Sequence, residues 1–382
     1  MRRPTPSALR TFLLAAGHLV LLALCLELAA RLDDRITWGA PLLDRYDAEV
    51  LRDVDADGIR HNVPGARFQK WRIDSLGFRG DGVSHEKPPG HVRVVCLGQS
   101  ESFGLYEGEG GEWPARLGRF LRARHPEVEV LNASVVGRGV ETRRAYLERY
   151  VFPVQPDVVV LVPNPYELEL TPPAPPGAAV RTEPSPAPGP AWTELSSRLL
   201  PKLSLRFSSI APALARAVRT WRLDRTLAAA DRRAHPLEAL PAGARARYGD
   251  RIRELVAAAR AHGATAVLVT YPTLVDEANR TEFHLEISQK RVWMPEFSES
   301  ALIGIVRSLN GDLRGLAAEL GVPLVDAAAA VPRTPAFFAD DVHYTDQGAE
   351  RVAESVRDVL ERGLSPHPAS TVRGAAPVAA ER

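Results

Sequence analysis

Three side chains with the chemistry of an activated nucleophile and its base occur in two distant parts of the 382-residue chain. Ser100 lies two residues after Gly98, directly beyond the apolar run Val92–Leu97, where a sharp turn can present its hydroxyl. Asp340 and His343 lie three residues apart on a predicted loop, a spacing that lets a carboxylate accept the Nδ1–H of the imidazole and fix its tautomer. A serine hydroxyl becomes nucleophilic when a base takes its proton. Together, the three residues predict acyl transfer.

Two further residues are candidates for hydrogen-bond donors to an oxyanion. Gly137 follows the apolar run that ends at Leu131, and a glycine lets the backbone N–H approach a ligand closely. Asn164 lies between Pro163 and Pro165, which restrict the backbone and so limit the directions open to its amide. Donors of this kind stabilise the negative charge that develops on a carbonyl oxygen during acyl transfer.

Short apolar runs rich in β-branched residues predict strands buried on both faces of a parallel sheet. Amphipathic stretches of helical periodicity alternate with them, which predicts an α/β fold with a flavodoxin-like, doubly wound sheet. Sites in such sheets lie at the carboxyl ends of the strands, so we expect the candidate loops to converge at one edge. The runs are Val92–Leu97, Val128–Leu131, Asp157–Val162, Thr265–Thr270 and Val322–Val325; the helical stretches are Trp113–Arg124, Glu141–Tyr150, Arg251–Ala261, Ser308–Leu320 and Gln347–Leu360.

Three segments interrupt or follow this alternation. Residues 171–246 predict a Pro-rich linker and a helical insertion, which either covers the site as a lid or faces a membrane. The stretch Asn279–Glu299 predicts a mobile loop at the rim of the pocket. Residues 363–382 are rich in Ala and Pro and predict a disordered tail.

The candidate segments resemble, in order, the sequence blocks of the SGNH/GDSL hydrolase superfamily. Gly98–Gly104 is similar to the nucleophile block, Asn132–Gly137 to the second block and Asp340–His343 to the block that carries the base, while Asn164 falls where the third block has its Asn. The preceding stretch Arg72–Gly80 resembles a segment often found before the domain in membrane-tethered bacterial members.

This resemblance implies an SGNH hydrolase fold over residues 92–362, with Ser100 as nucleophile, His343 as base and Asp340 as the partner of His343. It also implies an oxyanion hole formed by the N–H groups of Ser100 and Gly137 and the amide of Asn164. The chain departs from the family pattern where Gln99 replaces Asp in the first block. In the third block, Val162 replaces Gly and Pro165 replaces Asp.

The N-terminal segment predicts a membrane anchor. The apolar run Thr11–Ala30 is about long enough to cross the hydrocarbon core of a bilayer, and the arginines before it predict a cytoplasmic N-terminus. We expect a cytoplasmic tail over residues 1–10, a transmembrane signal anchor over 11–31 and a juxtamembrane segment over 32–91, with the rest outside the cytoplasm at the cell (inner) membrane. A cleaved signal peptide is the alternative, although the run lacks a good pair of small residues for cleavage.

The charge balance and residue spacing argue against other kinds of partner. Lys+Arg 48 and Asp+Glu 47 give a net charge of +1, so no nucleic-acid partner is expected. The His residues lack metal-ligand spacing, and the calcium-loop-like stretch Asp53–Gly58 has Pro64 where the last carboxylate should stand. No Gly-x-Gly-x-x-Gly follows the first strand, and we expect neither a metal nor another cofactor.

The sequence therefore favours a membrane-anchored serine esterase that cleaves a small acyl ester through Ser100, His343 and Asp340. An O-acyltransferase or deacylase that acts on an acylated envelope polysaccharide or lipid would use the same triad, with a sugar hydroxyl replacing water in the transferase. A third hypothesis, motivated by Val162 and Pro165, is a catalytically degenerate component of the cell envelope.

Overall fold

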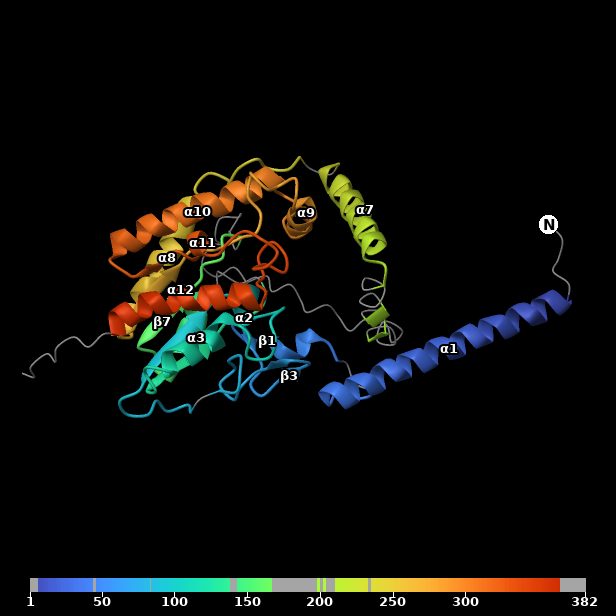
Figure 1. Ribbon diagram of the computed structural model, residues 1–382, viewed down its shortest axis with the longest axis horizontal. Helices are drawn as coiled ribbons and strands as arrows, with labels where there is room; N and C mark the ends of the chain where they lie inside the picture. The colour runs from blue at the N-terminus through green and yellow to red at the C-terminus, as the bar shows by residue number, and fades with distance from the viewer. Residues whose placement is uncertain are drawn as a thin grey trace, which may run out of the picture.

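The computed structural model describes residues 6–43, 46–82, 84–137, 143–166, 198–199, 202–203, 210–232 and 235–364 (Figure 1). Much of the predicted linker and the predicted tail from residue 365 onward lie outside the described residues. The long helix α1 (Pro6–Trp38) extends away from an α/β body.

A five-stranded parallel sheet forms the centre of the body. Its order is β6 (Val128–Asn132), β5 (Val92–Leu97), β7 (Val158–Leu161), β8 (Thr265–Val269) and β9 (Leu324–Val325). The prediction of a doubly wound sheet is confirmed, because the first strand of the sheet pairs with the second on one side and the third on the other. The direction of winding reverses between β5 and β7, and in such sheets that reversal opens a crevice at the carboxyl ends of the strands.

Two layers of helices cover the sheet. On one side, α3 (Trp113–Arg122) packs against β6 and against α12 (Asp346–Leu364). On the other side, α8 (Ala244–Ala261) packs against β8, α4 (Arg143–Tyr146) and α10 (Glu299–Leu320). Buried side chains four residues apart, such as Leu117 and Leu121 of α3, fix the face that each helix presents to the core. The chain continues from α4 into a π-helical turn over Leu147–Val151 and a 3-10 turn over Phe152–Val154.

The prediction of a loop over Asn279–Glu299 is wrong, because this stretch contains helix α9 (His284–Trp293). Its periodicity is weak, with Ile287 as the one buried aliphatic side chain, so the helix depends on tertiary packing. Part of that packing comes from α7 (Pro212–Asp231), the described helix of the predicted insertion.

The predicted juxtamembrane segment contains two small hairpins that dock beside the carboxyl ends of β5 and β6. They pair β1 (Arg52–Val54) with β2 (Arg60–Asn62), and β3 (Arg67–Phe68) with β4 (Trp71–Arg72). A 3-10 turn, Ala48–Leu51, precedes them. A separate apolar cluster holds this unit together and includes Phe103 from the segment after β5; its buried members are Leu51, Phe68, Ile73 and Phe103.

Helix α1 is long and apolar enough to cross a membrane, a test that a signal sequence also passes. Its apolar side chains from Phe12 to Leu28 are largely exposed, in contrast to those of the helices that cover the sheet.

Candidate functional site

Ser100, His343 and Asp340 lie in one continuous chain of hydrogen bonds. His343 Nε2 lies 2.8 Å from Ser100 Oγ. On the other side of the ring, His343 Nδ1 lies 2.7 Å and 2.9 Å from the two carboxylate oxygens of Asp340. Ser100 begins the short helix α2 (Ser100–Phe103) directly after β5, whereas Asp340 and His343 lie on the loop before α12. The fold thus brings Ser100 together with Asp340 and His343, which lie 240 and 243 positions later in the sequence.

The Asp340 carboxylate is built to remain charged. Besides the imidazole, it accepts hydrogen bonds from the backbone N–H groups of Val342 and His343, both at 2.9 Å. Burial works to raise the pKa of this carboxyl, but the bonds from His343 and the backbone outweigh burial and lower the pKa to about 2. An ionised Asp340 holds the proton of His343 on Nδ1, which leaves Nε2 free to accept the proton of Ser100.

Tight packing determines the conformation of the loop Gly98–Gly104, which carries the candidate nucleophile Ser100 and is called the nucleophile loop below. A Cβ on Gly98 would lie 2.1 Å from Ser102 Oγ, so a side chain here would collide with the turn below Ser100. The carboxylate of Glu101 accepts a hydrogen bond from Gln99 N at 2.8 Å, and the short helix ends at Gly104 in the left-handed region, with φ of 86°. These contacts aim Ser100 Oγ toward His343 Nε2.

The two candidate oxyanion donors take different positions. The side-chain amide of Asn164 donates from Nδ2 to Gln99 Oε1 at 2.8 Å, so Asn164 lies beside the nucleophile loop. Its Oδ1 accepts from Tyr166 N at 2.9 Å, which orients the amide. Gly137 has φ of 117°, and a Cβ there would approach the guanidinium of Arg60 to 3.1 Å. Glycine is therefore required at this position of the loop after β6.

Tyr106 lies against His343, and the next residue, Glu107, acts on the imidazole electrostatically; the sequence indicated neither. The Tyr106 ring is 5.4 Å from the imidazole of His343, and burial together with the nearby Asp340 carboxylate raises the pKa of Tyr106 to about 12. Glu107 is buried and accepts from Tyr106 N at 3.1 Å. Burial raises the pKa of Glu107 to about 7, with Glu112 acting in the same direction and His343 in the opposite one.

The N-terminal hairpins hold the nucleophile loop from outside. Trp71 Nε1 donates to Gly104 O at 3.0 Å, and Arg79 Nε donates to Phe103 O at 3.3 Å with its guanidinium over the Phe103 ring. Asn62 Nδ2 donates to Ser134 O at 3.1 Å on the loop after β6. Arg79 belongs to the Arg72–Gly80 stretch that the sequence analysis singled out, although nothing in the sequence indicated which residues Arg79 would contact.

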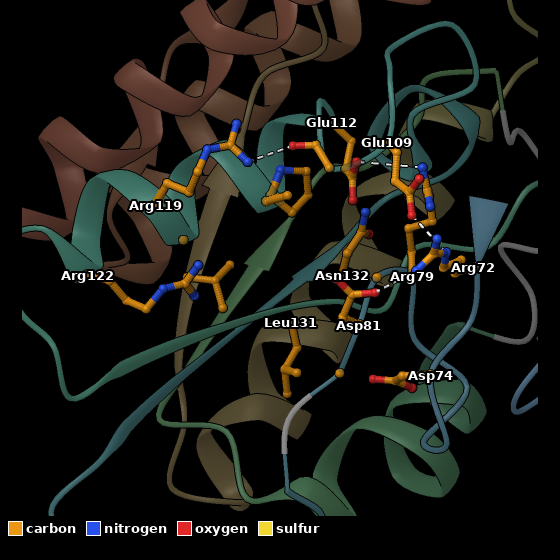
Figure 2. Close-up of a pocket in the computed structure, with 17 residues that line it drawn as sticks. Arg72, Asp74, Arg79, Asp81, Glu109, Glu112, Arg119, Arg122, Leu131 and Asn132 are labelled. Carbon is orange, nitrogen blue, oxygen red and sulfur yellow. Dashed lines mark hydrogen bonds and ion pairs between the residues drawn. The ribbon is translucent and has the colours of Figure 1, made fainter. Parts of the chain in front are cut away.

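A charged cavity of about 410 Å³ lies between the hairpins, α3 and β6 (Figure 2). Ion pairs cross its wall: Arg79 Nη2 lies 3.7 Å from Glu112 Oε2, and Arg72 Nε lies 2.7 Å from Glu109 Oε1 (Figure 2). Since Ser100 and His343 do not line it, this cavity is separate from the triad. The described residues contain no group of three or more His, Cys, Asp or Glu that could hold a metal ion.

Replacing Glu107 by glutamine should flatten the pH dependence of stability. The ordinary pKa of this carboxyl is 4.5 and its folded value is about 7, so between these values the folded state binds a proton that the unfolded chain has lost. The contribution of Glu107 to stability therefore falls as the pH rises from about 5 to about 7. We expect the melting temperature of the wild type to fall more between pH 5 and pH 8 than that of Glu107→Gln. Parallel melting curves would contradict this assignment; Asp341, whose pKa burial raises to about 6, is present in both proteins.

Of the comparisons with known proteins, only the one with solved structures found matches. No protein-family model matches the sequence, and no curated protein is similar to it in sequence. A GDSL-like lipase from Bacteroides thetaiotaomicron is 13% identical with a TM-score of 0.39, and the match covers 71% of this chain and 89% of that chain.

Two other solved structures give similar values. For an acetyl xylan esterase variant from Geobacillus stearothermophilus, the identity is 14%, the TM-score 0.40 and the coverage 70% of this chain and 94% of that chain. A member of the lipolytic G-D-S-L family from Veillonella parvula is 12% identical with a TM-score of 0.40, and the match covers 71% of this chain and 99% of that chain. At these identities and TM-scores, the similarity does not assign an activity to this chain.

Proposed function

We propose that this protein is a serine esterase of the SGNH type, which cleaves an acyl ester through Ser100, His343 and Asp340. One observation carries the proposal: Ser100 Oγ, the His343 imidazole and the Asp340 carboxylate are joined by contacts of 2.7 to 2.9 Å. The doubly wound sheet supports it, because the nucleophile loop follows a central strand of that sheet at its carboxyl end.

In the proposed reaction, each proton transfer has a donor and an acceptor. His343 Nε2 takes the proton of Ser100 as Oγ attacks the ester carbonyl, and Asp340 stabilises the imidazolium that forms. The oxyanion accepts hydrogen bonds from the backbone N–H groups of Ser100 and Gly137 and from the second Nδ2 hydrogen of Asn164. The carbon–oxygen bond to the alcohol then breaks, and His343 protonates the departing alcohol. Water, deprotonated by His343, hydrolyses the acyl-enzyme and restores Ser100.

The same proposal includes a location. Helix α1 anchors the chain in the cell membrane, and the arginines before its apolar run orient the α/β body to the extracytoplasmic side. The substrate is then a small acyl ester or an acylated glycan or lipid of the cell envelope.

Hydrolysis of p-nitrophenyl acetate by the purified full chain in detergent micelles tests the proposal. We expect release of p-nitrophenol above the background rate, and an excess of oligosaccharide acceptor should leave acetate as the main product. Acetyl transfer to the oligosaccharide that outpaces hydrolysis would instead identify an O-acyltransferase. Absence of both reactions in folded protein would contradict the proposal and favour a non-catalytic envelope component.

Asn164→Ala should lower kcat by about 10²- to 10³-fold with little change in KM, because an oxyanion donor acts mainly in the transition state. Gln99→Ala removes only the acceptor that orients the Asn164 amide, so its effect should be smaller. Steady-state kinetics on p-nitrophenyl acetate, with melting temperatures to confirm folding, measure both. Equal losses of kcat in the two variants, or no loss in Asn164→Ala, would contradict the assignment of Asn164 as an oxyanion donor.

A further inference from the structure

Helix α7 presents one face to the body and an apolar stripe to solvent. Leu227 is buried and Leu223 is half-buried on the side opposite the stripe, and α7 packs against α9. On the outer side, Leu214 is 55% exposed and Trp221 is 56% exposed, two turns apart on the same line of the helix. Ile210, just before the helix, is 75% exposed. Large side chains of this kind seldom form an exposed stripe on a soluble surface.

Arginines border this stripe. Arg222 and Arg225 are exposed on the side of α7 that carries the stripe, whereas Arg216 turns toward the body, where its Nη2 lies 3.7 Å from Glu286 Oε1 of α9. The one acidic residue of α7 before Asp231 is Asp224. The guanidinium of Arg225 lies 4.9 Å from the centre of the Trp221 ring. An apolar stripe that contains Trp and is bordered by basic residues is the pattern of a helix that lies in a membrane interface.

The chain just before α7 is fastened to the carboxyl-terminal end of α1. Arg198 donates to Pro41 O at 2.6 Å, and its guanidinium lies over the Tyr46 ring. Lys202 pairs with Asp33 and lies 2.9 Å from Asp34 Oδ1. These contacts hold Arg198 and Lys202, which precede α7, beside the end of α1 that would emerge from a bilayer. Figure 1 shows α7 on the side of the body from which α1 extends.

We propose that α7 lies in the headgroup region of the membrane that α1 spans, with Ile210, Leu214 and Trp221 against the acyl chains and Arg222 and Arg225 on anionic lipid phosphates. This inference rests on the proposed anchor and deepens the proposed function. Arg219 is among the charges that act on the Tyr106 hydroxyl beside the triad, so the membrane-bound helix lies near the site. The substrate is accordingly an acyl ester presented at the membrane surface, in preference to one dissolved in bulk water.

Quenching of Trp221 by lipid tests the inference in the full chain. The chain is reconstituted in vesicles of phosphatidylcholine and phosphatidylglycerol, with or without lipids brominated on the acyl chain near the headgroup. The Trp221 signal is the difference in emission between the wild type and Trp221→Phe. We expect brominated lipid to quench this signal strongly and acrylamide in the water to quench it weakly. Strong acrylamide quenching without lipid quenching would overturn the inference.

Two variants and a second readout sharpen the test. Leu214→Asp should reduce the lipid quenching of Trp221, whereas Val54→Asp, which alters an exposed apolar residue on β1, should not. Leu214→Asp should also lower kcat/KM about tenfold on a vesicle-embedded ester and leave soluble p-nitrophenyl acetate unaffected. A Trp221 shielded from both quenchers in a cross-linkable dimer would assign the stripe to a second copy and overturn the inference. Lipid quenching without any esterase activity would support membrane docking while contradicting the proposed function.

Discussion

Replacement of Ser100 by alanine should lower kcat for hydrolysis of p-nitrophenyl acetate by about 10⁴- to 10⁶-fold, while the melting temperature stays near that of the wild type. The alanine lacks the oxygen that forms the acyl-enzyme, so the remaining rate comes from binding and the oxyanion donors alone. Ser100 is partly exposed, and its hydroxyl contacts His343 Nε2, so the change leaves little buried polar surface without a partner. Steady-state kinetics on the purified full chain measure the loss.

Ser102→Ala is the matched control for this prediction. Ser102 lies on the same short helix, but its hydroxyl is buried and donates to Glu101 Oε1 at 3.2 Å, away from the triad. We expect the control to lose stability and to retain most of its activity. If Ser102→Ala abolished hydrolysis and Ser100→Ala did not, the identity of the nucleophile would be wrong.

Asp340→Asn should lower kcat by about 10⁴-fold. An asparagine has nearly the same shape, but its amide nitrogen can face His343 Nδ1 as a donor. The imidazole proton would then move to Nε2, where it prevents the ring from accepting the proton of Ser100. Rates at neutral pH and melting temperatures separate this loss of the correct tautomer from a loss of folding.

The neighbouring Asp341 provides the control for Asp340. Its Oδ1 accepts from Val275 N at 3.1 Å and its Oδ2 from the Tyr166 hydroxyl at 3.4 Å, so it joins two loops and does not contact the imidazole. Asp341→Asn should therefore affect stability more than kcat. A larger loss of kcat in Asp341→Asn than in Asp340→Asn would reverse the roles of the two carboxylates.

The central sheet could be predicted because its strands consist largely of apolar, β-branched residues buried on both faces. Val92–Leu97 forms a strand with the predicted bounds, whereas the strand expected over Val322–Val325 is reduced to Leu324–Val325. Pro323 explains part of this difference, because it has no N–H to donate to a neighbouring strand. The two- and three-residue strands of the N-terminal hairpins are too short for any alternation of apolar and polar residues to be visible.

The triad could be selected by residue type and order, but its surroundings could not. Tyr106 and Arg79 reach His343 and the nucleophile loop through tertiary contacts that leave no local pattern in the sequence. The prediction of a loop around α9 was wrong for the same reason, because contacts with α7 and α10 stabilise a helix whose own apolar periodicity is weak.

Covalent labelling with a fluorophosphonate tests the central claim most directly. The reagent phosphonylates a serine only when a neighbouring base has activated the hydroxyl. After labelling of the folded full chain and digestion, mass spectrometry should find the adduct on Ser100, and Asp340→Asn should be labelled far more slowly. An unlabelled Ser100 in folded protein, or an adduct on another serine, would contradict the account.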